Sequence, residues 1–394
     1  MLTTGNRRQF LKQIGLTAAG TLIAPAFLHA HDHSIPKFGG RRLVVIQLSG
    51  GNDGLNTVVP FRNDILYEAR PQLLAKPSEL LKVSDELAFN PAMEGFRSLF
   101  DEGDVCVLNS VGYPNPNRSH FRSMDIWHTA SDAGKYSSTG WLGRYLDHEC
   151  TANTNVTSIE IGQVLSLALK GAEFKGTPVA NINQFYNASR KVAAGSYDGQ
   201  NETASFLYKT VLDIKSTASY LYEKKKIYQS KKTYPKTKLG NDLKKIAEMI
   251  HSGVDSSIYY ASLSGFDTHF NQEARQQRLL KVYSESLKTF VEDLKQSGEW
   301  KNTLVLTFSE FGRRVKQNAS GGTDHGKANC LFLAGGALKK QGLYNDLPTL
   351  DHLDKGDLNH EIDFRQVYST ILDRWLSADA GKILGKKYEG LAFV

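Results

Sequence analysis

Six acidic and histidine side chains stand beside apolar stretches that the sequence predicts as strands. They are Asp53, Asp267, His269, Glu310, Asp324 and His325. Carboxylates and neutral imidazoles are the ligands that proteins offer to divalent ions such as Zn, Mn, Mg or Ca. The first four residues follow predicted strands and the last two precede one, and open α/β sheets bind ligands at the carboxyl ends of their strands. The pattern predicts a site for one or two divalent metal ions, which could clamp both oxygens of an in-line phosphoryl or sulfuryl displacement.

Each of these residues also has a plainer interpretation when it is taken alone. Asp53 lies in Asn-Asp-Gly, which is common turn chemistry, and Glu310 could cap a helix that follows it. Asp267 and His269 share one irregular loop after a buried strand, where packing gives little reason to keep them. The metal site is favoured because all six residues stand at predicted strand ends.

A candidate nucleophile lies in the segment Asn-Pro-Asn-Arg-Ser-His-Phe, residues 115–121. Asn117 is a good N-cap, so Ser119 is expected in the first helical turn, where free amides and the helix dipole stabilise an anion. Arg118 is suited to holding an oxyanion through two hydrogen bonds. The alternative is that Ser119 only caps the helix and His120 packs locally.

The elements that must position these residues follow from an alternation of apolar stretches of strand length with amphipathic stretches of helix length. This alternation predicts an α/β fold with a mostly parallel central sheet between helices on both faces. The expected strands are 43–48, 105–108, 257–261, 303–308 and 331–333, and the expected helices are 117–130, 140–148, 271–296 and 364–376.

The N-terminus has the pattern of an export signal. Arg7 and Arg8 precede an uncharged, mildly apolar stretch, 14–28, that is too short to span a bilayer comfortably. We interpret residues 1–30 as a twin-arginine signal peptide and 31–394 as one domain, which predicts a periplasmic or cell-surface protein. A basic first turn on a buried helix is the alternative, and a leader that stays uncleaved as an anchor is left open.

The net charge and its distribution along the chain limit the classes of partner that the protein could bind. The net charge is +7, of which three charges lie in the leader and six in the lysine-rich segment 222–238, so the rest of the chain is slightly acidic. This segment, part of an expected helical and loop insertion at about 200–240, is interpreted as a solvated helix end and loop, with an anionic surface as the alternative. No nucleic-acid partner is predicted, association with the envelope or a membrane surface is left open, and the oligomeric state is undetermined.

Cys106, Cys150 and Cys330 allow at most one disulfide and indicate no thiolate zinc site.

The order of these motifs resembles the exported family known as domain of unknown function 1501. The resemblance is carried by LVVIQLSGGNDGLN, GYPNPNRSHFRSMDIWHTA, GWLGRYLD, GFDTHFNQ, TLVLTFSEFGRR and GTDHGKA. That family resembles the alkaline phosphatase and sulfatase superfamily, whose members use one or two divalent metals with a Ser, Thr or modified Cys nucleophile. The resemblance implies an alkaline-phosphatase-like fold in which Asp53 is shared by the metals and Ser119 is the nucleophile. It also implies that Asp267, His269, Glu310 and His325 are ligands.

The chain departs from the superfamily pattern in ways that limit the expected activity. One residue, Thr268, separates Asp267 from His269 where three are usual, and Phe311 stands where a histidine ligand is usual. No Cys-x-Pro-x-Arg motif is present, so a formylglycine sulfatase is not expected. The sequence predicts an exported metal-dependent hydrolase of phosphate or sulfate esters, acting on a small molecule or a glycan, with Ser119 or a metal-bound water as nucleophile. The alternative is an inactive fold of this kind that binds an anionic glycan or surface partner through 222–238.

Overall fold

A computed structural model describes residues 40–149, 158–192, 202–347 and 350–394. The expected signal peptide and Cys150 lie outside the described residues. Cys106 and Cys330 are both buried and free. None of the described helices has the length and apolar character that a membrane crossing requires.

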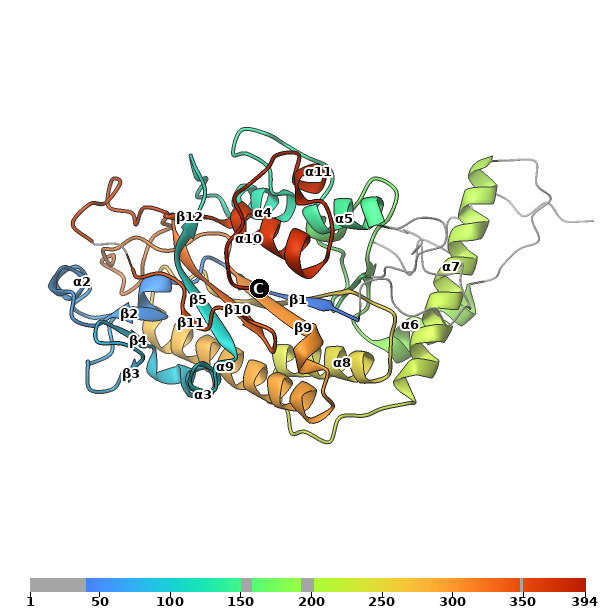
Figure 1. Ribbon diagram of the computed structural model, residues 1–394, viewed down its shortest axis with the longest axis horizontal. Coiled ribbons are helices and arrows are strands. Elements are labelled where there is room, and N and C mark those ends of the chain that lie inside the picture. The colour runs from blue at the N-terminus through green and yellow to red at the C-terminus, as the bar shows by residue number, and fades with distance from the viewer. Residues whose placement is uncertain (1–39, 150–157, 193–201, 348–349) are drawn as a thin grey trace, which may run out of the picture.

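A nine-stranded sheet forms the centre of the described part of the chain (Figure 1). Its order is β11-β5-β10-β9-β1-β8-β6-β7, with β12 also paired to β5. The strands are β1 (Arg42–Ser49), β5 (Val105–Gly112), β6 (Ser158–Glu160), β7 (Thr177–Pro178), β8 (Ile258–Ser264), β9 (Thr303–Phe308), β10 (Asn329–Gly335), β11 (Gly342–Leu343) and β12 (Ile362–Asp363). Every pairing except the two made by β10 is parallel, so the expected mostly parallel sheet is confirmed.

The antiparallel strand β10 explains how residues that precede a strand join those that follow one. Because β10 runs against β9 and β5, its first residues lie at the edge where β1, β8 and β9 end. The loop before β10, which carries Asp324 and His325, is therefore delivered to the carboxyl edge of the parallel strands.

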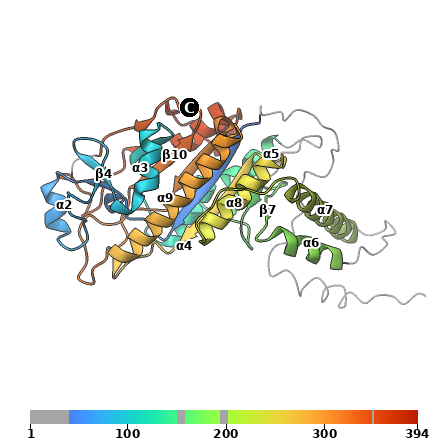
Figure 2. The same cartoon turned by 90° about the horizontal axis from the view of Figure 1, so that it is seen from below.

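Helices cover both faces of the sheet and bury two separate cores (Figures 1 and 2). Strand β1 shows why: Val44 and Ile46 belong to one core, whereas Leu43 and Val45 belong to the other, as the two-residue period of a strand requires. The first core packs under α3 (Glu94–Asp101), α8 (Lys238–His251) and α9 (Gln272–Gln296). The second packs under α4 (His120–Thr129), α5 (Trp141–Glu149), α10 (Phe364–Thr370) and α11 (Ala380–Leu384).

The expected helices and strands are present with shifted bounds. The change that matters for the site is at α4, which begins at His120 with Ser119 in the N-cap position, whereas the sequence predicted Asn117 there. A π-helical stretch, Ile371–Trp375, continues α10. The remaining described elements are a small antiparallel sheet, β2 (Val58–Pro60), β4 (Leu87–Phe89) and β3 (Leu81–Lys82), and helices α2 (Asp64–Ala69), α6 (Ile182–Lys191) and α7 (Glu202–Lys225).

The lysine-rich segment 222–238 comprises the end of α7, a loop and the first residue of α8. A buried carboxylate of α9 holds the loop, because Asp293 accepts hydrogen bonds from the hydroxyls of Ser230 at 2.6 Å and Tyr234 at 2.9 Å. The three tyrosine rings of this segment have partners or burial within the chain. Tyr222 stacks on Tyr186, the Tyr228 ring lies against His251, and Tyr234 is buried.

Candidate metal centre

Four donor atoms converge at the carboxyl edge of the sheet. The Oδ1 atom of Asp267, in the loop after β8, lies 3.1 Å from Nε2 of His269 and 3.2 Å from Nε2 of His325. The Nε2 atom of His120, the first residue of α4, is 3.4 Å from the same oxygen. The two nitrogens of His269 and His325 are themselves 2.9 Å apart. Three imidazoles therefore point the same ring nitrogen at one carboxylate oxygen.

The other ring nitrogen of each imidazole faces an acceptor. Nδ1 of His120 is 2.8 Å from Glu310 Oε1, Nδ1 of His325 is 2.7 Å from the carbonyl oxygen of Arg118, and Nδ1 of His269 is 3.4 Å from Asp324. Acceptor oxygens face both nitrogens of each ring, because every Nε2 atom also faces Asp267, so a cation bound at the Nε2 atoms would place the ring protons on Nδ1. In that tautomer the Nε2 lone pairs would be available to the cation.

This arrangement fits a metal ion on several counts. One ligand atom from each of His120, Asp267 and His325 lies within 4.8 Å of the other two, and Nε2 of His120 is a buried atom with no hydrogen-bond partner. Ligands about 2 Å from a tetrahedral zinc ion lie about 3.3 Å apart, close to the separations of the Nε2 atoms from Asp267 Oδ1. His269 stands outside the group of three, although its Nε2 atom is 2.9 Å from that of His325. The hydrogen bonds from Nδ1 to acceptors are the outer contacts that fix metal-bound histidines in metalloproteins.

A buried arginine and one close-packed glycine bring the loops together. Arg313, after β9, donates to the carbonyl oxygens of Gly51 at 2.7 Å, Phe266 at 2.9 Å and Thr323 at 2.9 Å, as well as to Asp267 Oδ1 at 3.0 Å. Gly50 has φ +118° and lies so near the 266–267 backbone that a Cβ would be 2.4 Å from the nitrogen of Asp267. Both features hold the Asp267 loop against the end of β1.

The charges of the centre are those of a cation site. Desolvation would raise the pKa of Asp267, but hydrogen bonds from Arg313 and His325 outweigh it and lower the pKa to about 2. The hydrogen bond to Glu310 raises the pKa of His120, whereas burial lowers that of His325. The side chain of Asp267 is 47% exposed, so a substrate could approach the centre from solvent.

Glu310 and Asp324 lie one contact away from the converging atoms. The Oε1 atom of Glu310 accepts from the amide of Gly50 at 2.9 Å as well as facing His120. The segment after Glu310 forms no helix, so the alternative that Glu310 caps one is wrong. In this structure both carboxylates contact imidazoles of the centre, and their own binding of a metal stays a prediction.

Asp53 has partners of its own. Its Oδ2 atom accepts from Arg70 Nη1 at 2.8 Å and from the side-chain amide of Gln272, and the side chains of Asp53 and Arg70 are both fully buried. Arg70 also donates to the carbonyl oxygens of Val315 and Arg314. This ion pair holds the turn after β1, and Asp53 does not belong to the group of donors around Asp267.

Ser119 and Arg118 lie at the start of α4, next to His120. Ser119 is exposed and its side chain makes no capping hydrogen bond, so the plain capping role expected as an alternative is not seen. The guanidinium group of Arg118 forms an ion pair with Asp357. His120 is not among the ligands predicted from the sequence, although its position directly after the candidate nucleophile Ser119 was a usable signal.

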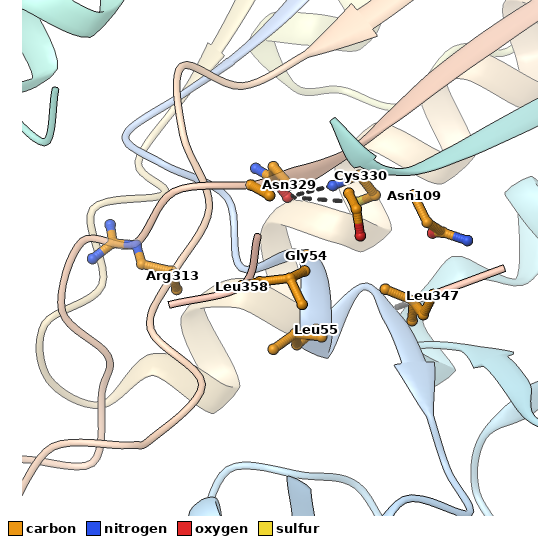
Figure 3. Close-up of a pocket in the computed structure, with 10 residues that line it drawn as sticks. Gly54, Leu55, Asn109, Arg313, Asn329, Cys330, Leu347 and Leu358 are labelled. Carbon is orange, nitrogen blue, oxygen red and sulfur yellow. Dashed lines mark hydrogen bonds between the residues drawn. The ribbon is translucent and has the colours of Figure 1, made fainter. Parts of the chain in front are cut away.

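A cavity behind the turn after β1 does not belong to this centre (Figure 3). It is lined by Gly54, Leu55, Asn109, Ser110, Arg313, Ala328, Asn329, Cys330, Leu347 and Leu358. Its volume of about 10 Å³ has room for no more than a single water molecule. This cavity is therefore too small to hold a substrate.

The fold and the donor set define a mixed α/β protein with a candidate His/Asp metal site. The family described as Protein of unknown function (DUF1501) matches residues 106–380, and the chain belongs to this family. The resemblance expected from the motifs is thereby confirmed. Among curated proteins, none matches the chain.

The chain is also similar to several solved structures at low sequence identity. The lipoteichoic acid synthase LtaP from Listeria monocytogenes is 9% identical, with a TM-score of 0.42 over 93% of this chain and 80% of that one. The C-terminal periplasmic domain of EcEptC from Escherichia coli in complex with Zn is 11% identical, with a TM-score of 0.38 over 75% and 74%. A protein in the alkaline phosphatase superfamily from Vibrio parahaemolyticus is 12% identical, with a TM-score of 0.36 over 86% and 71%.

Proposed function

We propose that this protein is an exported, metal-dependent hydrolase of phosphate or sulfate esters. The observation that carries the proposal is the convergence of three imidazole Nε2 atoms on Asp267 Oδ1, beside an exposed serine. The ligands would be His120, Asp267 and His325, whose donor atoms form one group, and His269 stays a predicted fourth ligand. Such an imidazole-rich set favours Zn over Mg or Ca, which prefer oxygen ligands.

A divalent ion in this centre would act as a Lewis acid toward an oxygen of the bound ester. The chain's own groups do the rest. Glu310 holds the proton of His120 on Nδ1, and Arg313 holds the carboxylate of Asp267 in place. The hydroxyl of Ser119, which makes no capping hydrogen bond, is the proposed nucleophile, and the N-terminus of α4 stabilises negative charge beside it.

The test uses the full-length chain purified without added metal. Elemental analysis is expected to find about one equivalent of a transition metal, and panels of phosphomonoesters, phosphodiesters and sulfate esters to reveal hydrolysis. Removal of the metal with a chelator should abolish turnover, and zinc should restore it. Ser119→Ala is expected to lower kcat at least about 100-fold if the serine is the nucleophile, and to have little effect if water is. A metal-free, inactive preparation would overturn the proposal.

The alternative function, an inactive protein that binds an anionic partner through the lysine-rich segment, has less support. Three lysines of that segment form ion pairs with acidic residues: Lys226 with Glu223, Lys232 with Glu292 and Lys238 with Asp242. These contacts reduce the positive charge that the segment would offer to an anionic glycan.

A further inference from the structure

Two arginines share one buried carboxylate beside the candidate metal centre. The side chain of Asp357 is fully buried, and Arg118 Nη2 donates to its Oδ2 atom. Arg314 Nε lies 3.4 Å from the other oxygen, Oδ1. The two arginine side chains are 37% and 36% exposed, so each is partly open to solvent.

A tight turn, residues 354–357, is built to present this carboxylate. Asp354 and Asp357 exchange two backbone hydrogen bonds of 3.0 and 3.1 Å, and the residues between them, Lys355 and Gly356, have φ +55° and +87°. Positive φ at both central positions is typical of a type I′ turn. Arg314 packs on this turn: its Nη2 donates to the carbonyl of Lys355, and a Cβ at position 356 would approach that nitrogen to 3.3 Å.

The arginine pair is joined directly to the metal centre. The carbonyl oxygen of Arg118 accepts from Nδ1 of His325 at 2.7 Å, and Arg118 immediately precedes Ser119. The backbone amide of Arg314 donates to the carbonyl of Asp324 at 3.0 Å. Both arginines are therefore fastened to residues 324–325, on the border of the proposed site.

The charges of this group do not cancel. One carboxylate faces two guanidinium groups, which leaves a net charge of +1, while the neighbouring Lys327 is paired with Asp354. A guanidinium group has five N–H donors and Asp357 can occupy only some of them. One arginine would suffice to anchor the turn, whereas two partly exposed arginines held by one buried acid have the donors and the charge that an anion receptor needs.

We propose that Arg118 and Arg314 bind a second anionic group of the substrate, a sulfate, phosphate or carboxylate, while the reacting ester lies at the metal centre. This rests on the proposed function. It names the substrate class as esters that carry at least one further negative group, such as a multiply sulfated glycan or a polyphosphorylated small molecule. It assigns Arg118 to the non-reacting anion, in place of the reacting oxyanion expected from the sequence.

Equilibrium binding tests the subsite without turnover. The full chain, treated with a chelator, is titrated by calorimetry at low salt with a heparin-derived tetrasaccharide and, separately, with inorganic pyrophosphate. Arg314→Gln is expected to weaken the binding of at least one probe about tenfold, and Arg314→Lys to weaken it less. Arg190→Gln, which removes an exposed arginine from α6, is the matched control and should leave the affinity unchanged.

The outcomes separate this inference from the proposed hydrolase. Equal affinities of wild type and Arg314→Gln, or no binding of either probe to wild type, would overturn the subsite. If binding depends on Arg314 but the protein hydrolyses no ester, the result would contradict the proposed hydrolase function and support the anion subsite. If thermal melts show that Arg314→Gln is unfolded, Arg118→Gln carries the same expectation.

Discussion

At the scale of single residues, the direction of each imidazole decides what the centre can bind. Glu310, Asp324 and the carbonyl of Arg118 occupy the Nδ1 side of the three rings, so only the Nε2 atoms face Asp267. Fixing a ring from its outer nitrogen sets both its tautomer and its orientation. Glu310 and Asp324, which the sequence predicts as ligands, therefore position the rings of His120 and His269 in this structure.

The two aspartates that the sequence treats alike are expected to behave differently when they are replaced. Asp267→Asn removes the central anionic donor and should abolish metal binding, and because it also takes the charged partner from the buried Arg313, it should lower the free energy of unfolding as well. Asp53→Asn leaves Arg70 buried without its counter-charge, so it should lower the free energy of unfolding by about 3 kcal/mol and retain the metal.

Elemental analysis and urea denaturation of both variants check this prediction. Loss of the metal from a folded Asp53→Asn protein would return Asp53 to the ligand set. Retention of a full equivalent of metal by Asp267→Asn would exclude Asp267 as a ligand.

At the scale of elements, α9 serves two regions at once. Its first residue, Gln272, contacts Asp53, and near its end Asp293 holds the loop between α7 and α8. Desolvation would raise the pKa of Asp293, but hydrogen bonds from His251, Ser230 and Tyr234 outweigh it and lower the pKa. The ionised carboxylate is therefore the form that secures the lysine-rich loop.

A pH-dependent loss of stability follows from the lowered pKa of Asp293. The stabilisation is fully present above the ordinary aspartate pKa of about 4 and is lost as the pH falls through the lower folded value. Asp293→Asn should lower the free energy of unfolding by about 2 kcal/mol at pH 7, and by less at pH 3.

Urea denaturation at both pH values measures the difference. The matched control is Glu292→Gln, the adjacent carboxylate, which is 42% exposed and paired with Lys232. Its effect should stay below about 0.5 kcal/mol. A deficit in Asp293→Asn that is equally large at pH 3 would contradict the expected titration.

At the scale of the whole molecule, the excess positive charge belongs to two segments of the sequence. The predicted signal peptide, residues 1–30, accounts for three charges, and in the lysine-rich segment part of the charge is paired with acids. The charge of the whole chain is therefore a poor guide to the partner, whereas the local surplus at Arg118 and Arg314 lies beside the candidate site.

Export through the twin-arginine route is testable on the intact chain. Replacing Arg7 and Arg8 together by lysine preserves the charge and removes the paired guanidinium groups, so the protein should remain in the cytoplasm. Cell fractionation with antibody detection measures its location, and Lys12→Arg in the same leader is the control that should still be exported. Normal export of the double-lysine variant would contradict the predicted route.

The sequence by itself was sufficient for the parallel sheet and for the region of the centre. A buried parallel strand is a short continuous apolar stretch, which 43–48 and 303–308 display, and such strands end at a common edge. Asp267, His269 and His325 could be selected because polar residues at that edge follow directly from the pattern.

Only the tertiary structure decided what each of these side chains contacts. Asp53 pairs with Arg70 and Gln272, 17 and 219 positions away, and no local pattern reports such partners. His120 joins the donors because α4 begins at that residue, and the loop of His325 reaches them because β10 is antiparallel. Residue types and strand ends are local properties of a chain, whereas the direction of a side chain depends on packing between distant segments.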